Sequence, residues 1–66
     1  MWRYECKVWY EECPNGQAFH ADTMAQIRRI LRGLLPNVRA LRIARASTGR
    51  ILRMVLRDEI RGFASR

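Results

Sequence analysis

The sequence lacks the features that most often reveal a function directly. No apolar run approaches the roughly 20 residues that span a bilayer, and no glycine-rich phosphate loop is present. Cys6 and Cys13 are the only cysteines, too few for the disulfide scaffold of a small secreted domain. Charges interrupt the first ten residues, unlike a signal peptide. We therefore expect a reduced, cytoplasmic protein with no membrane partner.

Residues for catalysis or metal binding are also scarce. Cys6, Cys13 and His20 are seven residues apart, whereas structural zinc sites need four ligands and short Cys-x-x-Cys spacing. His20, Asp22 and Ser47 supply the three catalytic-triad types, but no motif brings the three together. We predict that the protein is not an enzyme and has no catalytic residues, no metal site and no cofactor. Cys6 is interpreted as a small core residue.

Acidic residues are few compared with basic ones. Thirteen lysines and arginines face six aspartates and glutamates in 66 residues, for a formal net charge of +7. Twelve of these cations are arginine, which suits forked contacts with phosphate or carboxylate but also accumulates in GC-rich genomes. Apolar residues form 48% of the chain, which argues against disorder and predicts a single domain over 1–66. The charge excess favours a polyanion or an acidic protein surface as partner.

Residues 2–11 alternate in the manner of a half-buried strand. The even positions are the apolar side, and the odd positions are polar except for Trp9. We expect the even side to face the core, comprising Trp2, Tyr4, Cys6, Val8 and Tyr10. The run Cys13–Gly16 predicts a turn, and residues 17–20 fit a short return strand with Phe19 inward.

Residues 22–35 show helical periodicity. Thr23 and Gln26 match a capping box, in which each side chain satisfies a free amide. An apolar stripe about 140° wide predicts the buried side, comprising Met24, Ile27, Ile30, Leu31, Leu34 and Leu35. Gly33 weakens the last turn and Pro36 ends the helix. Arg28, Arg29 and Arg32 share the opposite side.

Residues 38–57 hold six arginines between apolar residues. The Ser47–Gly49 break predicts a hairpin folded about Thr48 and Gly49. The expected register of its two strands sets Ile43 opposite Met54, Leu41 opposite Leu56, Ala40 opposite Arg57 and Arg39 opposite Asp58. Glu11-Glu12 and Asp58-Glu59 are interpreted as charges at strand ends. The alternative is an α-rich fold in which residues 47–63 are helical.

These elements predict an α+β fold with one amphipathic helix on one face of a small antiparallel sheet. The order is strand, helix, strand, strand, with the short strand before the helix as an optional addition, and the last strand lies between the first and the second. The opposite, open face would then carry Arg3, Lys7, Trp9, Arg42, Ile51, Arg53, Val55 and Arg57. The partner-binding candidates are Lys7, Trp9, Arg42, Arg53 and Arg57, with Arg28, Arg29 and Arg32 as a secondary contact.

Two stretches carry a resemblance to a known family. The helix and its approach, Gly16 to Ile30, and the run "LRIARASTGRILRMVLRDE" resemble small phage-encoded anti-CRISPR proteins that inhibit type I surveillance complexes. Some of those proteins pack one helix on a small antiparallel sheet with a final hairpin. The resemblance implies a stoichiometric inhibitor that docks on the complex and blocks its engagement of target DNA. It carries over no site residue.

Three hypotheses follow for the function. In the first, the open face docks on an acidic protein surface of a nucleic-acid-processing complex and blocks it. In the second, the chain is a basic module for DNA or RNA, in which arginines meet phosphates and Trp9 stacks on a base. In the third, the chain forms a homodimer through an exposed edge strand.

Overall fold

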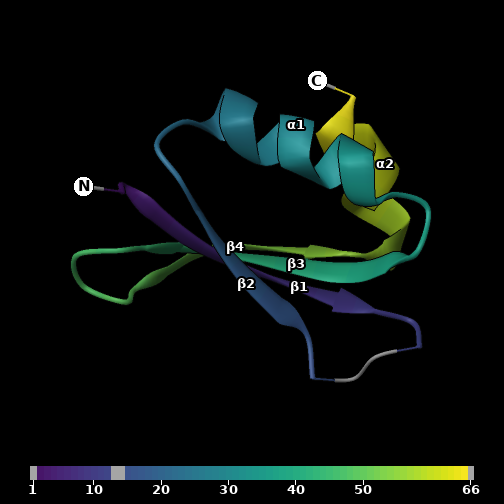
Figure 1. Cartoon of the computed structure of the whole chain (residues 1–66), viewed down its shortest axis with the longest axis horizontal. Coiled ribbons are helices and arrows are strands. Elements are labelled where there is room, and N and C mark those ends of the chain that lie inside the picture. Colours follow the sequence, from purple (N-terminus) through teal and green to yellow (C-terminus); the bar gives the residue numbers. More distant parts are fainter. Residues whose placement is uncertain (1, 13–14, 66) are drawn as a thin grey trace.

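The computed structural model describes residues 2–12 and 15–65, and within them four strands form one sheet that carries two helices (Figure 1). All neighbouring strands are antiparallel. In chain order the elements are β1 (Tyr4–Tyr10), β2 (Gln17–Ala21), α1 (Met24–Leu34), β3 (Val38–Arg45), β4 (Ile51–Leu56) and α2 (Arg57–Ala64). The predicted small α+β fold is confirmed. The predicted Cys13–Pro14 part of the first turn lies outside the described residues.

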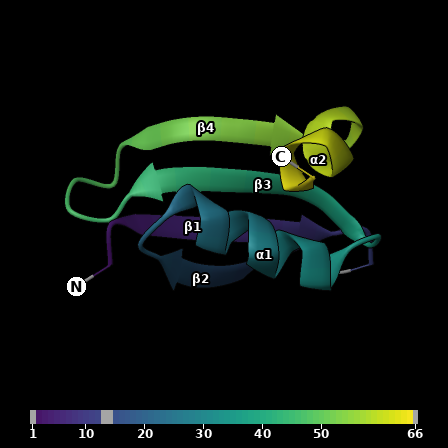
Figure 2. The same cartoon turned by 90° about the horizontal axis from the view of Figure 1, so that it is seen from above.

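The strand order β2-β1-β3-β4 differs from the predicted order. The last strand was expected between the first and the second, but β4 lies at the edge of the sheet, and β1 pairs with β3. β2 pairs with β1 and occupies the other edge. β3 holds the central place, since it buries Leu41, Ile43 and Ala44, whereas β4 buries Val55 alone. The helical crossover therefore connects β2 to β3 over β1, as Figure 2 shows. Within the described ranges, no helix is long and apolar enough to cross a membrane.

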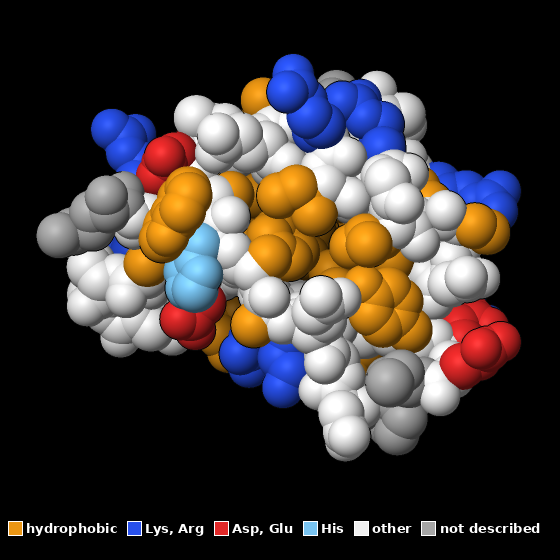
Figure 3. Space-filling view, viewed as in Figure 1, with side chains coloured by type: hydrophobic (Ala, Val, Ile, Leu, Met, Phe, Trp, Pro, Cys, Tyr) orange, Lys and Arg blue, Asp and Glu red, His pale blue; other side chains and the backbone are white. Residues whose placement is uncertain are grey.

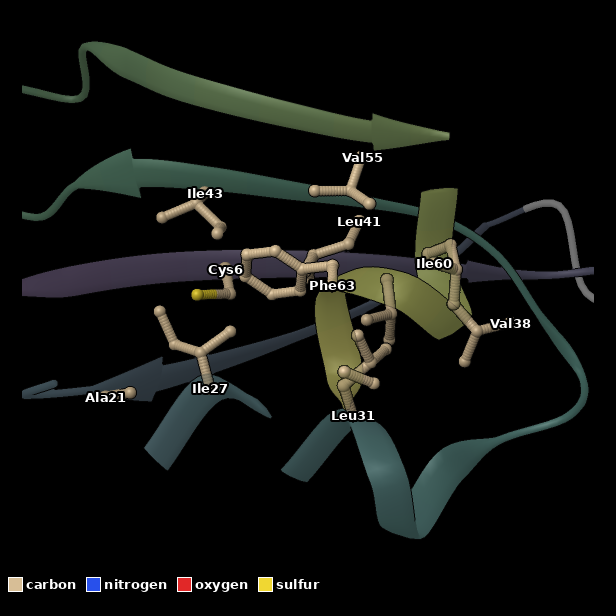
Figure 4. Close-up of a cluster of buried hydrophobic side chains, with 12 residues drawn as sticks. Cys6, Ala21, Ile27, Leu31, Val38, Leu41, Ile43, Val55, Ile60 and Phe63 are labelled. Atoms are coloured by element: carbon tan, nitrogen blue, oxygen red, sulfur yellow. The ribbon is translucent and has the colours of Figure 1, made fainter. Parts of the chain in front are cut away.

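Both helices cover the same face of the sheet, and the core lies between them and the strands (Figures 1 and 4). Cys6 and Val8 of β1 are buried there, and Tyr4, Tyr10 and Phe19 pack against the cluster. The predicted inward side of the first strand is thus confirmed within β1. Trp2 is the exception, since its side chain is 53% exposed and it precedes the strand.

The predicted α1 helix and its cap are confirmed. Thr23 is the N-cap, and its hydroxyl accepts a hydrogen bond from the Gln26 amide at 3.1 Å. The Gln26 side chain in turn accepts from the Asp22 amide at 2.7 Å. Ile27 and Leu31 are fully buried against the sheet, so the apolar stripe faces the core as its period requires.

The helix α2 was not predicted. Residues Arg57 and Asp58 were expected to extend the last strand, and Asp58 and Glu59 instead occupy the first turn of this helix, where acidic side chains favour the helix dipole. Ile60, Phe63 and Ala64 recur at helical spacing and are buried. Their periodicity was visible in the sequence, but the stretch was too short to outweigh the strand pattern before it.

The predicted hairpin is present, but its register is wrong by one residue. Leu41 pairs with Val55 and Ile43 with Arg53, rather than with Leu56 and Met54. The loop is longer than expected: Arg45 closes it by donating its amide to the Arg50 carbonyl at 2.9 Å. Gly49 occupies the left-handed region there, with φ of 74°, which favours glycine. An irregularity at Ile43/Ala44 then sets the final register, because it inserts one extra residue into β4.

Candidate binding face

The sheet face away from both helices carries a small basic cluster built on β1 and β3. Paired residues of neighbouring strands share a face, and Lys7 pairs directly with Arg42. Because Cys6 and Val8 point into the core, Lys7 and Trp9 point to the open face. The Lys7 ammonium lies 5.3 Å and the Arg42 guanidinium 5.7 Å from the Trp9 ring centroid. Three of the predicted partner-binding residues are therefore brought together.

Lys7 and Arg42 carry like charges in directly opposite positions, an arrangement that destabilises a sheet. Among the residues that the structure describes, neither forms an ion pair with a carboxylate. The Nε of Arg42 is buried and has no hydrogen-bond partner there. The Trp9 ring attracts both cations through its π face, and an anionic group placed over the cluster would neutralise both.

Beside this cluster, β4 adds apolar side chains that the sequence reasoning placed on the other face. Met54 pairs with Arg42 and Leu56 with Ala40, so both lie on the open face. Leu56 is 56% exposed, whereas Val55 between them is completely buried. Ile51 pairs with Ala44 and is exposed on this same face, as expected. Apolar residues occur on both sides of β4, so alternation alone did not reveal which side faces the core.

Arg53 and Val55 are not on the open face, contrary to the prediction. Arg53 shares the helix face with Ile43, and its guanidinium lies 5.1 Å from the Phe63 ring centroid. Val55 is part of the core. Both corrections follow from the one-residue difference in register, since a shift by one residue moves every side chain of a strand to the opposite face.

Arg57 is also displaced from the predicted position. It is the first residue of α2 and forms an ion pair with Glu11, which follows β1. The Arg57 side chain is 62% and the Glu11 side chain 50% exposed, and exposed pairs contribute little to stability. The pair lines a shallow hollow at one end of the sheet together with Arg39, Ala40 and Leu56. Arg57 therefore borders the open face near Leu56 without being part of it.

The three arginines proposed as a secondary contact on α1 lie in different surroundings, because two of them contact α2. The Arg28 guanidinium lies 5.2 Å from the Phe63 ring centroid, and Arg32 donates a hydrogen bond to the Ala64 carbonyl at 3.2 Å. These two side chains therefore hold the helices together. Arg29 alone of the three lines the hollow beside Trp2, His20 and Ile30. The three do not form one surface.

Cys6 and His20 point to opposite sides of the sheet. Cys6 is buried in the core and pairs with Phe19, whereas His20 pairs with Glu5. His20 stacks on Trp2, with ring centroids 6.3 Å apart, and its Nε2 lies 3.6 Å from a Glu5 carboxylate oxygen. Figure 3 shows the histidine side chain, in pale blue, at the surface. No cluster of metal-ligating residues occurs among the described ones, and Cys13 lies outside them.

Burial also alters the chemistry of the Cys6 thiol. Removal from water, with a smaller effect of the neighbouring Glu5 charge, raises the pKa of Cys6 from 9.0 to about 11. The thiol is therefore protonated at neutral pH, and thiols react mainly as thiolates. These facts agree with the interpretation of Cys6 as a core residue.

Comparisons of the chain with protein-family models, with curated proteins and with solved structures gave no match. We define this open face by six residues from β1, β3 and β4: Lys7, Trp9, Arg42, Ile51, Met54 and Leu56.

Proposed function

We propose that the chain is a non-catalytic binding protein whose open face docks on an acidic protein surface with an apolar centre. The observation that carries this proposal is the juxtaposition of Lys7 and Arg42 over Trp9, beside exposed Met54 and Leu56. Tryptophan, arginine and methionine are enriched at protein interfaces. The two unpaired cations supply the attraction for carboxylates, and the apolar side chains supply desolvated contact area.

The apolar part of the face favours a protein over a nucleic acid. A stacking platform for bases needs an accessible aromatic face within a basic groove, whereas Trp9 is half-buried and both neighbouring cations lie over its ring. Ile51, Met54 and Leu56 would contact nothing complementary on a phosphate backbone. We therefore propose DNA or RNA binding only as the alternative outcome of the test.

The resemblance to phage-encoded anti-CRISPR proteins indicates which partner should be tested first. We propose that the chain acts as a phage-type inhibitor that docks on a type I CRISPR surveillance complex and blocks its engagement of target DNA. The net charge of +7 excludes imitation of DNA, so the docking surface of the complex is expected to be acidic.

The test compares binding of the Lys7→Glu/Arg42→Glu double variant with that of Arg29→Glu. The double variant reverses charge on the open face, and Arg29→Glu reverses charge on exposed α1. A Trp2→Phe background makes Trp9 the only fluorescent tryptophan. We expect the double variant to lose about 100-fold in affinity for a purified type I complex, as two lost charge contacts imply. Arg29→Glu should bind normally.

Oligonucleotides in the same titration distinguish the alternative. Duplex and single-stranded probes are measured at low and at physiological salt, because phosphate binding through several cations weakens steeply with salt. Tight, salt-sensitive binding of an oligonucleotide with quenching of Trp9 would replace the protein-docking proposal by the nucleic-acid module. Equal binding of the double variant and wild type to the complex would show that the open face is not the site.

A further inference from the structure

The outer edge of β4 is an open strand edge, and its only protecting features within the described residues are one bulge opposite Ile43/Ala44 and one charged side chain, Arg53. β4 pairs only with β3, and among the described elements none lies beyond it in the plane of the sheet (Figure 2). Such an edge presents unpaired amide and carbonyl groups, and proteins usually protect it with proline, lysine or inward-pointing charge. Within Ile51–Leu56 there is no proline and no lysine.

The edge is also apolar in an otherwise arginine-rich chain. Arg53 is the only charged residue of β4, and its guanidinium is held over Phe63. The remaining exposed side chains of the strand are all large and apolar: Ile51, Leu52, Met54 and Leu56. Arg57, at the end of the strand, is paired with Glu11. Charge repulsion along the edge itself is therefore small despite the net charge of +7.

We propose that β4 pairs antiparallel with β4 of a second copy, which joins two sheets into one of eight strands. A twofold axis perpendicular to the sheet keeps the two open faces on the same side. Paired residues must then share a face. Side chains alternate regularly from Arg53 to Leu56, beyond the bulge, so over this part of the strand the paired residue numbers must have an even sum.

Among these registers, only one avoids opposing arginines while it uses most of the strand. Centring the axis on Arg53 places Arg53 opposite its copy, and centring it on Val55 places Arg53 opposite Arg57. Centring it on Met54 instead sets Met54 opposite Met54, Leu52 opposite Leu56 and Arg53 opposite Val55. Met54 of each copy then lies beside Met54 and Leu56 of the other on the open face, and these exposed apolar side chains form a band across the interface. β4 is thus complementary to itself in this register.

The predicted dimer is weak. A standard protein–protein interface buries about 800 Å² of each partner, which is about a sixth of the 4773 Å² surface of this chain. Five paired residues with one apolar band bury less area than that. We expect dissociation constants of about 10–100 μM. The dimer would place two Lys7–Trp9–Arg42 clusters on one continuous face. Its formation through β4 does not require the proposed docking partner.

Cysteine cross-linking tests both the dimer and its register. In a Cys13→Ser background the remaining native thiol is the buried Cys6. Met54→Cys places the two new thiols directly opposite each other, where Cβ atoms of paired residues are about 5 Å apart. Leu56→Cys is the matched control, because its copies would lie about 14 Å apart along the strand. We expect rapid disulfide dimers from Met54→Cys only, and equal linking by both variants would overturn the register.

Sedimentation velocity from about 1 to about 500 μM spans the expected dissociation constant and measures the association without cross-links. Met54→Lys should abolish the concentration dependence, whereas Ala18→Lys adds the same charge to the exposed, opposite edge strand β2 and should not. Circular dichroism confirms that both variants are folded. A wild-type chain that stays monomeric throughout would overturn the proposal. Failure of the docking proposal alone would leave the sedimentation result unchanged.

Discussion

Adjacent residues of β1 have opposite roles because a strand alternates its side chains. Cys6 and Val8 are enclosed by α1, α2 and the neighbouring strands, whereas Lys7 and Trp9 lie on the open face. The same alternation places Cys6 and His20 on opposite faces of the sheet. At this scale a residue's chemistry follows from the face it occupies.

The Cys6 thiol predicts a pH dependence of stability. In the unfolded chain the thiol ionises near pH 9, and in the folded protein near pH 11. Between these values the unfolded state has lost the proton and the folded state retains it, so stability falls as pH rises from 9 to 11. The contribution is at most about 3 kcal/mol. Urea unfolding of wild type and Cys6→Ala between pH 8 and pH 11 measures it, and parallel curves for the two proteins would contradict it.

The elements at the C-terminal end decide which side of β4 faces the core. α2 begins immediately after Leu56 and places Ile60 and Phe63 over the sheet, so Val55 is enclosed and Met54 and Leu56 are not. Arg28 and Arg53 both contact the Phe63 ring. This short helix therefore determines the placement of residues on α1, on β4 and on the open face.

Phe63 is the side chain through which α2 can be tested. Phe63→Ala should destabilise the protein by about 3–5 kcal/mol, as for other buried aromatic truncations. The whole free energy of unfolding of a 66-residue domain is about 3–10 kcal/mol, so Phe63→Ala could unfold the protein. The milder Phe63→Leu should therefore be measured as well. Arg61→Ala, an exposed site on the same helix, should change stability by less than about 0.5 kcal/mol. Urea unfolding gives all three values, and a loss below about 1 kcal/mol for Phe63→Ala would show that α2 does not stabilise the core.

Over the described part of the molecule, few of the positively charged side chains lie next to a negatively charged one. Among the described residues Arg57 pairs with the Glu11 carboxylate, and the His20 imidazole lies 3.6 Å from a Glu5 carboxylate oxygen. These four side chains are each about half exposed. The other cations repel one another through solvent, which disfavours the compact state. Arginine contacts with Trp9 and Phe63 offset part of this repulsion.

Salt should therefore stabilise this protein. Screening lengths fall from about 30 Å at 0.01 M to about 8 Å at 0.15 M salt, which weakens repulsion among distant cations more than it weakens contacts within a pair. We expect the midpoint of thermal unfolding to rise by several degrees as sodium chloride increases over this range, a shift of roughly 1 kcal/mol. Lys7→Gln/Arg42→Gln removes the two directly opposed charges and should reduce the rise. A midpoint that falls with salt would show that attractive pairs dominate.

Part of the fold and part of the candidate site could be predicted from local pattern. The alternation around Cys6 and Val8, the capping residues of α1 and the hairpin turn near Gly49 each depend on neighbours in the chain. Lys7, Trp9 and Arg42 were placed correctly because β1 and β3 have one clearly apolar side. Arg53 and Arg57 were misplaced because the faces of β4 depend on a bulge and on a helix that follows it.

The sequence by itself determined the class of fold, the inward side of β1 and of α1, and the excess of positive charge. The fold class and the inward sides depend on hydrophobic periods of 2.0 and 3.6 residues, which residues close together in the sequence define. The charge excess depends on composition alone. Only the tertiary structure decided the strand order, the register of β4 and the membership of the open face. Those depend on which apolar surfaces cover one another, and β4 offers apolar side chains to both sides. Packing of α2 over Val55 left Ile51, Met54 and Leu56 exposed beside Lys7 and Arg42.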